Sequence, residues 1–307
     1  MKKKKVVLNG QPVGRMKAGW LLFKEAFRFM WADKEMLWLP IISCVANLLL
    51  IGMIIGLIIT AAFTFSPDFF EQYPMEYLWL FLIYVAGAFT LSLSQAAVAH
   101  FVFVRAHGGD ATLMEALKKA FSHWTGLLAW SVITSTVGLV LRVIYDRSEL
   151  LGKIVTALIG AAWGVLTYFV VPAIVIDNKG PVDSIKKSST VFRQTWGETL
   201  TSNISFGFLF LLVHLVVLFS TMGVIVFGAI MESMVVMVLG VVLIVVWVIA
   251  FSLVSSSIGA VLRTLLYIYA TEGVVPQNFN KELLEKMLAR KEAIDAAMPN
   301  QEQGSAI

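Results

Sequence analysis

The segment Val182–Trp196, VDSIKKSSTVFRQTW, lies directly before a long apolar run and guides the interpretation of the whole chain. Val182, Ile185, Phe192 and Trp196 fall near one face of a helix. Three basic residues fall away from that face: Lys186, Lys187 and Arg193. The pattern is typical of an amphipathic helix at a membrane surface, with a basic side and an aromatic end.

Two earlier segments repeat this pattern, Trp20–Trp31 (WLLFKEAFRFMW) and Leu113–Trp124 (LMEALKKAFSHW). Each carries basic residues away from its apolar face, has a Phe shortly before a final Trp, and precedes an apolar run. One such helix is common in membrane proteins, but three in similar register predict a threefold internal repeat. The final tryptophans are expected to act as interfacial anchors at headgroup depth: Trp31, Trp124 and Trp196.

The composition indicates a membrane protein. The chain has 307 residues, of which 58% are hydrophobic and 14% charged, whereas soluble domains carry roughly 25% charged residues. The mean hydropathy is +0.81. The single cysteine, Cys44, excludes an intrachain disulfide and is interpreted as a small buried hydrophobe. The net charge of +4 comes from basic residues beside the apolar runs, so it does not indicate nucleic-acid binding.

Six charge-free runs are long enough to cross a bilayer, which takes about 20 residues. They are Met36–Pro67, Tyr77–Val104, Ala120–Leu141, Ile154–Ile176, Thr199–Met231 and Ser233–Leu262. Glu232 alone separates the last two runs, and we predict a turn between Met222 and Gly228. The expected fold is all-α, with six transmembrane helices in three pseudo-repeated hairpins, each preceded by a cytoplasmic interfacial amphipathic helix.

The basic residues predict the orientation of the chain. Of the 24 lysines and arginines, 21 fall on one side of the six runs. The other side has only Arg142, Arg147 and Lys153. Since cytoplasmic loops are enriched in basic residues, both termini and all three interfacial helices are expected at the cytoplasmic face, against anionic lipid.

Hairpins that all start on the same side form a parallel repeat. The segment from Phe89 to Ala97 matches the segment from Phe251 to Gly259, and the second spans end near glycines. Small residues at matched positions are expected at close helix contacts. Around the membrane domain of residues 16–275, we expect a mobile basic tail at 1–15, a cytosolic helix at 276–298 and a disordered tail at 299–307.

Few polar residues fall inside the runs. The candidate intramembrane cluster contains four of them, His214, Gln95, His100 and Ser256, together with Arg263 directly after the last run. Ionisable groups inside a membrane suggest function by default. The alternative is structural, because a neutral histidine needs one interhelical hydrogen bond and Arg263 could extend to the headgroups. No Asp, Glu or Lys lies within the six runs, so no acidic ion pathway is evident.

Two further features have structural explanations. The pairs Gly52/Gly56 and Gly160/Gly164 suit either packing within the chain or contact with another copy. Pro172 suits either a kink near the cytoplasmic side or a proline tolerated without one. No His/Cys/Asp/Glu cluster has metal-ligand spacing, and no nucleophile elbow, P-loop or dinucleotide fingerprint occurs.

Four pieces of the chain carry a family resemblance: Gly19–Pro40, Arg147–Gly164, Tyr168–Ser188 and Phe192–Glu198. In this order they resemble the bacterial and archaeal integral-membrane family called domain-of-unknown-function family 6159, over roughly Gly19 to Glu272. The resemblance implies a prokaryotic plasma membrane and six spans. It implies no activity and no catalytic residue.

Together these observations predict a non-enzymatic, multi-pass protein of the prokaryotic inner membrane, without cofactor, that acts in scaffolding, lipid interaction or a larger membrane complex. Its expected partners are the anionic cytoplasmic leaflet and another membrane protein or a second copy. The main alternative is a transporter or exporter of a small or lipid-like molecule, with a cavity lined by His214, Gln95 and residues 255–257. A lipid-modifying enzyme is a third class, but the carboxylates Asp110 and Asp183 also suit helix capping.

Overall fold

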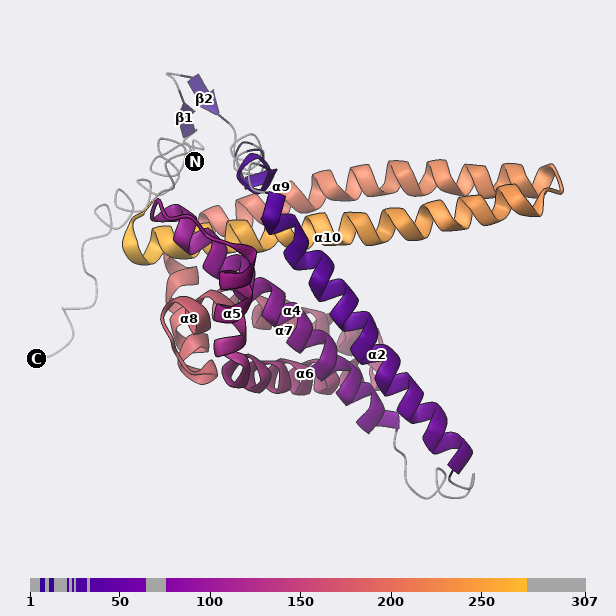
Figure 1. The fold of residues 1–307 in the computed structure, drawn as a ribbon, viewed down its shortest axis with the longest axis horizontal. Helices are drawn as coiled ribbons and strands as arrows, with labels where there is room; N and C mark the ends of the chain where they lie inside the picture. Colours follow the sequence, from indigo (N-terminus) through magenta and orange to yellow (C-terminus); the bar gives the residue numbers. More distant parts are fainter. Residues whose placement is uncertain are drawn as a thin grey trace, which may run out of the picture. The chain divides into compact units, whose positions relative to one another are not determined.

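The computed structural model describes residues 6–8, 11–13, 21, 24, 26–31, 34–64 and 76–274. Apart from a small hairpin of β1 (Val6–Leu8) and β2 (Gln11–Val13), the regular elements there are helical (Figure 1). They are η1 (Lys34–Leu37), α2 (Trp38–Thr64), α4 (Glu76–Ala106), α5 (Leu113–Ser122), α6 (Trp124–Arg147), α7 (Leu150–Leu166), α8 (Val170–Ile176), α9 (Pro181–Ile230) and α10 (Met234–Glu272). The hairpin was not predicted, because its strands have no period-two pattern. The expected helix at 276–298 and the tail at 299–307 lie outside the described residues.

Six helical segments of the described chain are long and apolar enough to cross a membrane, which confirms the predicted number. They are Trp38–Thr64, Tyr77–Ala106, Trp124–Arg147, Leu150–Ile176, Val213–Ile230 and Met234–Glu272. Their hydrophobic side chains are largely exposed in the isolated chain. Such a surface suits a lipid environment and not water, so the protein is a multi-pass membrane protein.

The chain forms two compact units. Unit 1 contains Thr195–Phe251, and unit 2 contains Met30–Gln194 and Ser252–Val274. The third predicted hairpin is divided between the units, so the threefold repeat stays a prediction. The interfacial helix of this hairpin was predicted as a separate element. Instead, residues 181–194 form the first part of α9.

Unit 2 is built around α4, which packs against α2, α5, α6 and α8. Residues 96–99 of α4, Ala-Ala-Val-Ala, are all buried, so neighbours enclose the helix on every side at this level. Small side chains permit this close approach. Of the two matched small residues, Ala97 lies in such a contact, but a Cβ at Gly259 would meet no atom within 4 Å. Among the described residues, the expected contact at Gly259 is therefore not found.

The second spans of the predicted hairpins end in a similar way. Gly108 follows α4 with φ +78°, and Gly273 follows α10 with φ +70°. After α8, the left-handed residue is Asn178 with φ +53°, two residues before Gly180. Residues in this conformation stop a helix by turning the chain, and Gly and Asn adopt it most readily.

Span four is divided by a turn. α7 ends at Leu166 and α8 begins at Val170, two residues before Pro172. A proline cannot donate its backbone nitrogen and clashes with the carbonyl four residues earlier, here Tyr168. The helix therefore breaks just before it, which supports the kink and not the tolerated proline. The buried Ser188 hydroxyl accepts a hydrogen bond of 2.9 Å from the Phe169 amide that the break leaves open.

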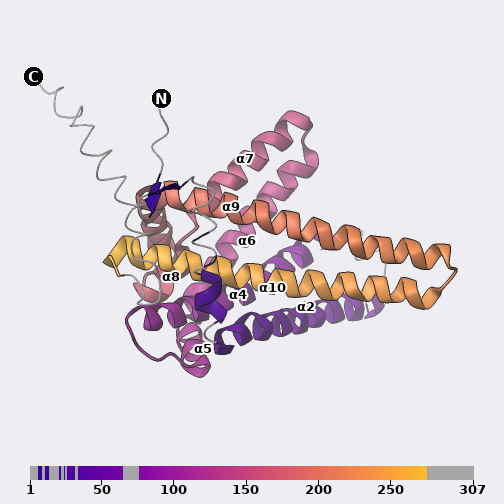
Figure 2. The same ribbon diagram turned by 90° about the horizontal axis from the view of Figure 1, so that it is seen from above.

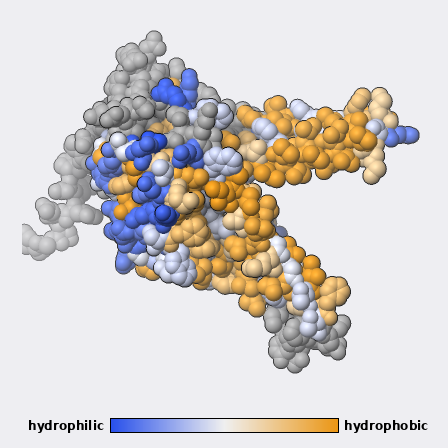
Figure 3. Space-filling view, viewed as in Figure 1, coloured by the Kyte–Doolittle hydropathy of each residue, from blue (hydrophilic) through white to orange (hydrophobic). Residues whose placement is uncertain are grey.

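In unit 1, α9 and α10 form an antiparallel hairpin whose surface is hydrophobic almost to its tip (Figures 1 and 3). The predicted turn at 222–228 is wrong, because the helix continues to Ile230 and Glu232 makes the turn with φ +50°. Gly228 serves close packing instead, since a Cβ there would lie 2.8 Å from the Met237 nitrogen. Gly240 has the same role, because a Cβ at this position would lie 2.5 Å from Ile225 Cγ1.

Candidate functional site

The polar groups of unit 2 gather where α4, α8 and α10 end and where α5, α6 and α9 begin, and this region is called the polar end. Figure 3 shows hydrophilic surface around α5, and Figure 2 shows α6 and α7 extending from this region as a hairpin. Side chains join the elements here. His107 lies 2.9 Å from Glu272, and His123 lies 2.6 Å from the Asn178 oxygen. These contacts place the predicted cytoplasmic loops at one end of unit 2.

α5 is the one predicted interfacial helix that the structure describes in full as a separate element. Thr112 and Glu115 form a capping box at its start, which satisfies two backbone amides. Glu35 of η1 accepts a further bond from the Leu113 amide. The buried residues of α5 are Ala116 and Ala120. The aromatic members of the predicted apolar face, Phe121 and Trp124, are exposed in the isolated chain, and their contact with a membrane stays a prediction.

The predicted anchors Trp31 and Trp124 have exposed rings, as contact with headgroups requires. The side chain of Trp196 lies outside the described residues.

An open groove at the polar end is lined mainly by lysines. The lysine groove has a volume of about 400 Å³ and is formed by Lys179, Asp183, Lys186, Lys187 and Thr190. The turn after α8 and the first three turns of α9 position these residues. The neighbouring Asp177 lies 3.9 Å from both Lys179 and Lys187. Three lysine ammonium groups therefore share the carboxylates of Asp177 and Asp183.

The predicted intramembrane cluster is brought together only in part. Arg263 Nη1 donates a 2.7 Å hydrogen bond to Gln95 Oε1, which joins α10 to α4. The guanidinium also lies 4.7 Å from the centre of the Tyr168 ring, in the turn before α8. Arg263 thus packs against protein groups of two other elements. Tyr168 was not predicted as a member of this cluster. The sequence indicated only that it lies four residues before Pro172.

Of the other members, His100 and Ser256 belong to unit 2 but have no hydrogen bond to this pair among the described residues. Ser256 faces a separate pocket, and His100 lies five residues beyond Gln95 on α4. His214 belongs to unit 1, where its ring lies 4.9 Å from that of Phe251 and its Nδ1 is buried without a hydrogen-bond partner. The cavity of the transport alternative would join residues of both units and stays a prediction.

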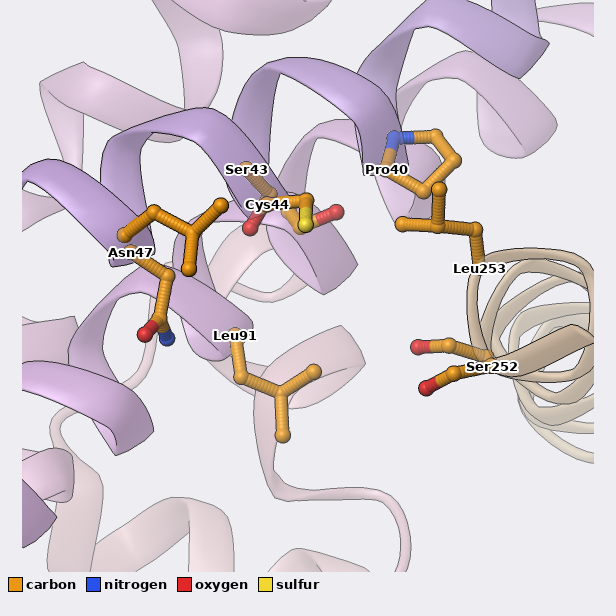
Figure 4. A pocket seen from close by; sticks show the side chains of 10 residues that line it. Pro40, Ser43, Cys44, Asn47, Leu91, Ser252 and Leu253 are labelled. Atoms are coloured by element: carbon orange, nitrogen blue, oxygen red, sulfur yellow. The ribbon is translucent and has the colours of Figure 1, made fainter. Parts of the chain in front are cut away.

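A second pocket lies among the spans of unit 2, between α2, α4 and α10 (Figure 4). This serine pocket has a volume of about 220 Å³. It is lined by Pro40, Ser43, Cys44, Asn47, Leu48, Leu91, Ser94, Ser252, Leu253 and Ser256. The segments that match between spans two and six thus face one another across it. Their sequence pattern indicated a repeat but did not identify a site.

Two lining side chains of the serine pocket are held by α4. Ser43 donates to the Thr90 carbonyl at 2.9 Å, and Asn47 Nδ2 donates to Thr90 Oγ1 at 2.6 Å. Thr90 donates in turn to the Ala86 carbonyl at 3.0 Å. This network fixes α2 against α4 and keeps one wall of the pocket in place.

Comparison with known proteins gives a family and no function. The model of a family of unknown function, DUF6159, matches residues 74–276. Three of the four pieces that carry the resemblance lie inside this range, whereas Gly19–Pro40 lies before it. No curated protein matches the chain. Within the described part of the chain, no group of three or more His, Cys, Asp or Glu side chains could hold a metal ion.

Proposed function

The chain belongs to the family of unknown function DUF6159, and we propose that it is a non-enzymatic protein of the prokaryotic plasma membrane that binds anionic phospholipid at its cytoplasmic face. The lysine groove carries this proposal. It presents three ammonium groups around one open space at the polar end. Ammonium groups bind phosphate as point charges and are attracted to an anionic leaflet.

The aspartate side chains near the lysine groove bind its lysines only weakly. The contacts of Asp177 with Lys179 and Lys187 are long, at 3.9 Å, and the pair of Lys186 with Asp183 is exposed at 3.4 Å. The exposed pair of Lys186 with Asp183 contributes about 0–1 kcal/mol, and at 3.9 Å the largely buried Asp177 makes no hydrogen bond to Lys179 or Lys187. A lipid phosphate can therefore replace them at little cost.

The surroundings suit a headgroup layer. Val182 at the start of α9, together with Phe121 and Trp124, presents exposed apolar surface near the lysines. α5 is tied to the groove through His123, which contacts Asn178 next to Lys179. Basic groups beside exposed aromatic ones are typical of segments that lie at the membrane–water interface.

In this role the protein acts as a scaffold or as a subunit of a larger membrane complex, with another membrane protein or a second copy as partner. Both termini are cytoplasmic in the proposal, because the polar end contains the loops with most basic residues. No cofactor and no nucleic acid takes part.

The groove can be tested by the number of anionic lipids that remain bound. The triple variant Lys179→Gln, Lys186→Gln, Lys187→Gln is compared with the native chain by native mass spectrometry after extraction from phosphatidylglycerol–phosphatidylcholine membranes. We expect bound phosphatidylglycerol to fall about tenfold or more, since each lysine near an anionic surface contributes about 1 kcal/mol. Phosphatidylcholine binding should not change.

The chain supplies a control of equal charge in Arg142, Arg147 and Lys153, which belong to the opposite end of α6 and α7. Changing these three to Gln should leave phosphatidylglycerol binding intact. Equal losses in both triple variants would mean that only total charge matters, and an unchanged groove variant would overturn the proposal.

Transport of a small or lipid-like molecule is the second candidate, and the serine pocket favours it by placing polar groups among the spans. Reconstituted protein would then have to increase the movement of a lipid between leaflets of a vesicle. No increase over protein-free vesicles would exclude this candidate for the lipid used.

A further inference from the structure

The hydroxyl groups of the spans fall into two classes. Most serines and threonines there donate to a carbonyl one turn earlier, for example Ser257 to Leu253 at 2.7 Å and Thr264 to Ala260 at 2.8 Å. This bond satisfies the hydroxyl inside a membrane. Of the hydrogen bonds found between described residues, none uses the hydroxyl of three serines that line the serine pocket. They are Ser94, Ser252 and Ser256, and they are partly or largely exposed, whereas the unbonded hydroxyls of Ser135 and Ser255 are buried outside the pocket lining.

These hydroxyls are suited to a polar group brought by a ligand. A hydroxyl without a partner among hydrocarbon is unfavourable, because neither water nor lipid chains can satisfy it. Asn47 adds an acceptor, since its amide nitrogen binds Thr90 and its oxygen faces no described donor. The lining contains no charged side chain. The chemistry therefore favours an uncharged group with hydroxyl and carbonyl oxygens over a phosphate or an amine.

The size and position of the pocket indicate which part of a ligand enters. Its volume of about 220 Å³ is smaller than the 300–1,000 Å³ that is usual for a whole drug-sized ligand. The rim includes Leu48 and Leu91, which are 63% and 47% exposed on the apolar surface of the spans. A polar head can thus enter while attached hydrocarbon stays on that surface, beside the leucines.

We propose that the serine pocket binds the glycerol part of a diacylglycerol, with its free hydroxyl and ester carbonyls on the pocket serines and Asn47 and its acyl chains on the apolar surface beside Leu48 of α2 and Leu91 of α4. The lipid's hydroxyl can donate to the Asn47 oxygen, and its carbonyls can accept from the serines. This site is distinct from the lysine groove, whose lining is charged, and it does not depend on the function proposed for that groove.

The test uses a photoactivatable diacylglycerol with a diazirine close to its glycerol, reconstituted with the full chain. After illumination, we expect cross-links in peptides that contain residues 40–48, 91–94 or 252–256, and we expect excess unlabelled diacylglycerol to remove them. The double variant Ser252→Ala, Ser256→Ala should lose cross-linking about fivefold or more, as the loss of two net hydrogen bonds requires. Ser257→Ala is the matched control, because its hydroxyl is already bound to Leu253.

Cys44, the only cysteine of the chain, lines the same pocket and reports on its integrity. An equal rate of Cys44 alkylation in detergent for the native chain and the double variant shows that the variant retains the pocket. Ser252→Leu, which fills the pocket, should abolish the cross-links. Labelling spread evenly over lipid-facing peptides would overturn the proposal, as would equal labelling by a photoactivatable phosphatidylcholine.

Discussion

At the scale of single residues, a few polar side chains in the spans of unit 2 are held by partners on other helices. Arg263 shows the principle, because Gln95 accepts its hydrogen bond and the Tyr168 ring covers its guanidinium. A cation inside a membrane is costly unless protein groups replace its water. The three groups come from α10, α4 and the turn before α8, so the arginine also fixes how these elements meet.

Ser188 gives a prediction at the same scale. Its buried hydroxyl is the partner of the Phe169 amide at the break in span four. Ser188→Ala leaves that amide buried and unbonded, which should lower the free energy of unfolding by about 1–3 kcal/mol. The measurement is thermal unfolding in detergent, followed by tryptophan fluorescence.

The neighbouring serine is the control for this prediction. The Ser189 hydroxyl is exposed and donates to the Lys186 carbonyl. Ser189→Ala should change the melting temperature little. If both variants melt alike, the Phe169–Ser188 bond does not stabilise the break.

At the scale of elements, the α9–α10 hairpin depends on two glycines. A Cβ at Gly228 would approach backbone atoms of α10, and one at Gly240 would approach Ile225. Gly228→Ala and Gly240→Ala should each destabilise the protein by about 1–3 kcal/mol, because helices in close contact must move apart. Gly223→Ala is the matched control on the same hairpin, since its Cβ would meet no atom within 4 Å.

Heat stability in detergent distinguishes these cases. The melting temperature should fall for Gly228→Ala and Gly240→Ala and not for Gly223→Ala. Because alanine favours helix formation over glycine by about 1 kcal/mol, Gly223→Ala is expected to be neutral or slightly stabilising. Destabilisation by Gly223→Ala alone would contradict the contact pattern of the hairpin.

The same hairpin shows what the sequence could predict. The spans could be located because length and hydropathy are local properties that the bilayer selects. The turn was misplaced because glycine suggested it at 222–228, whereas Gly228 serves a contact between helices and Glu232 adopts the left-handed conformation. The role of a glycine depends on which residues of the neighbouring helix lie opposite it. A single sequence does not show which residues these are.

The candidate sites follow the same rule. Polar residues of the spans were identified from composition alone, but the pairing of Gln95 with Arg263 and the serine pocket depend on how helices align across unit 2. Lys179, Lys186 and Lys187 were recognised as basic residues beside a span. Their convergence on one groove required the turn at Asn178, whose φ of +53° was not predicted.

At the scale of the whole molecule, the apolar helices and the polar end together indicate how the chain crosses the membrane. Contacts such as His107–Glu272 and His123–Asn178 gather loops of unit 2 at one end. α6 begins at this polar end and ends at Arg147, so the α6–α7 turn lies the length of one span away from the polar end. Six crossings with basic loops on one side predict that the polar end faces the cytoplasm.

Four single-cysteine variants in a Cys44→Ala background test this topology in intact cells. Asp110→Cys and Asp183→Cys lie at the polar end, whereas Glu149→Cys and Met231→Cys lie at the α6–α7 and α9–α10 turns, and all four positions are exposed. A membrane-impermeant maleimide should label positions 149 and 231 from outside and reach positions 110 and 183 only after the membrane is opened. Labelling of 110 and 183 alone would mean the inverse orientation, with the lysine groove facing away from the cytoplasmic leaflet. Different behaviour at 110 and 183 would contradict the six-span arrangement itself, because the contacts of unit 2 place both at one end.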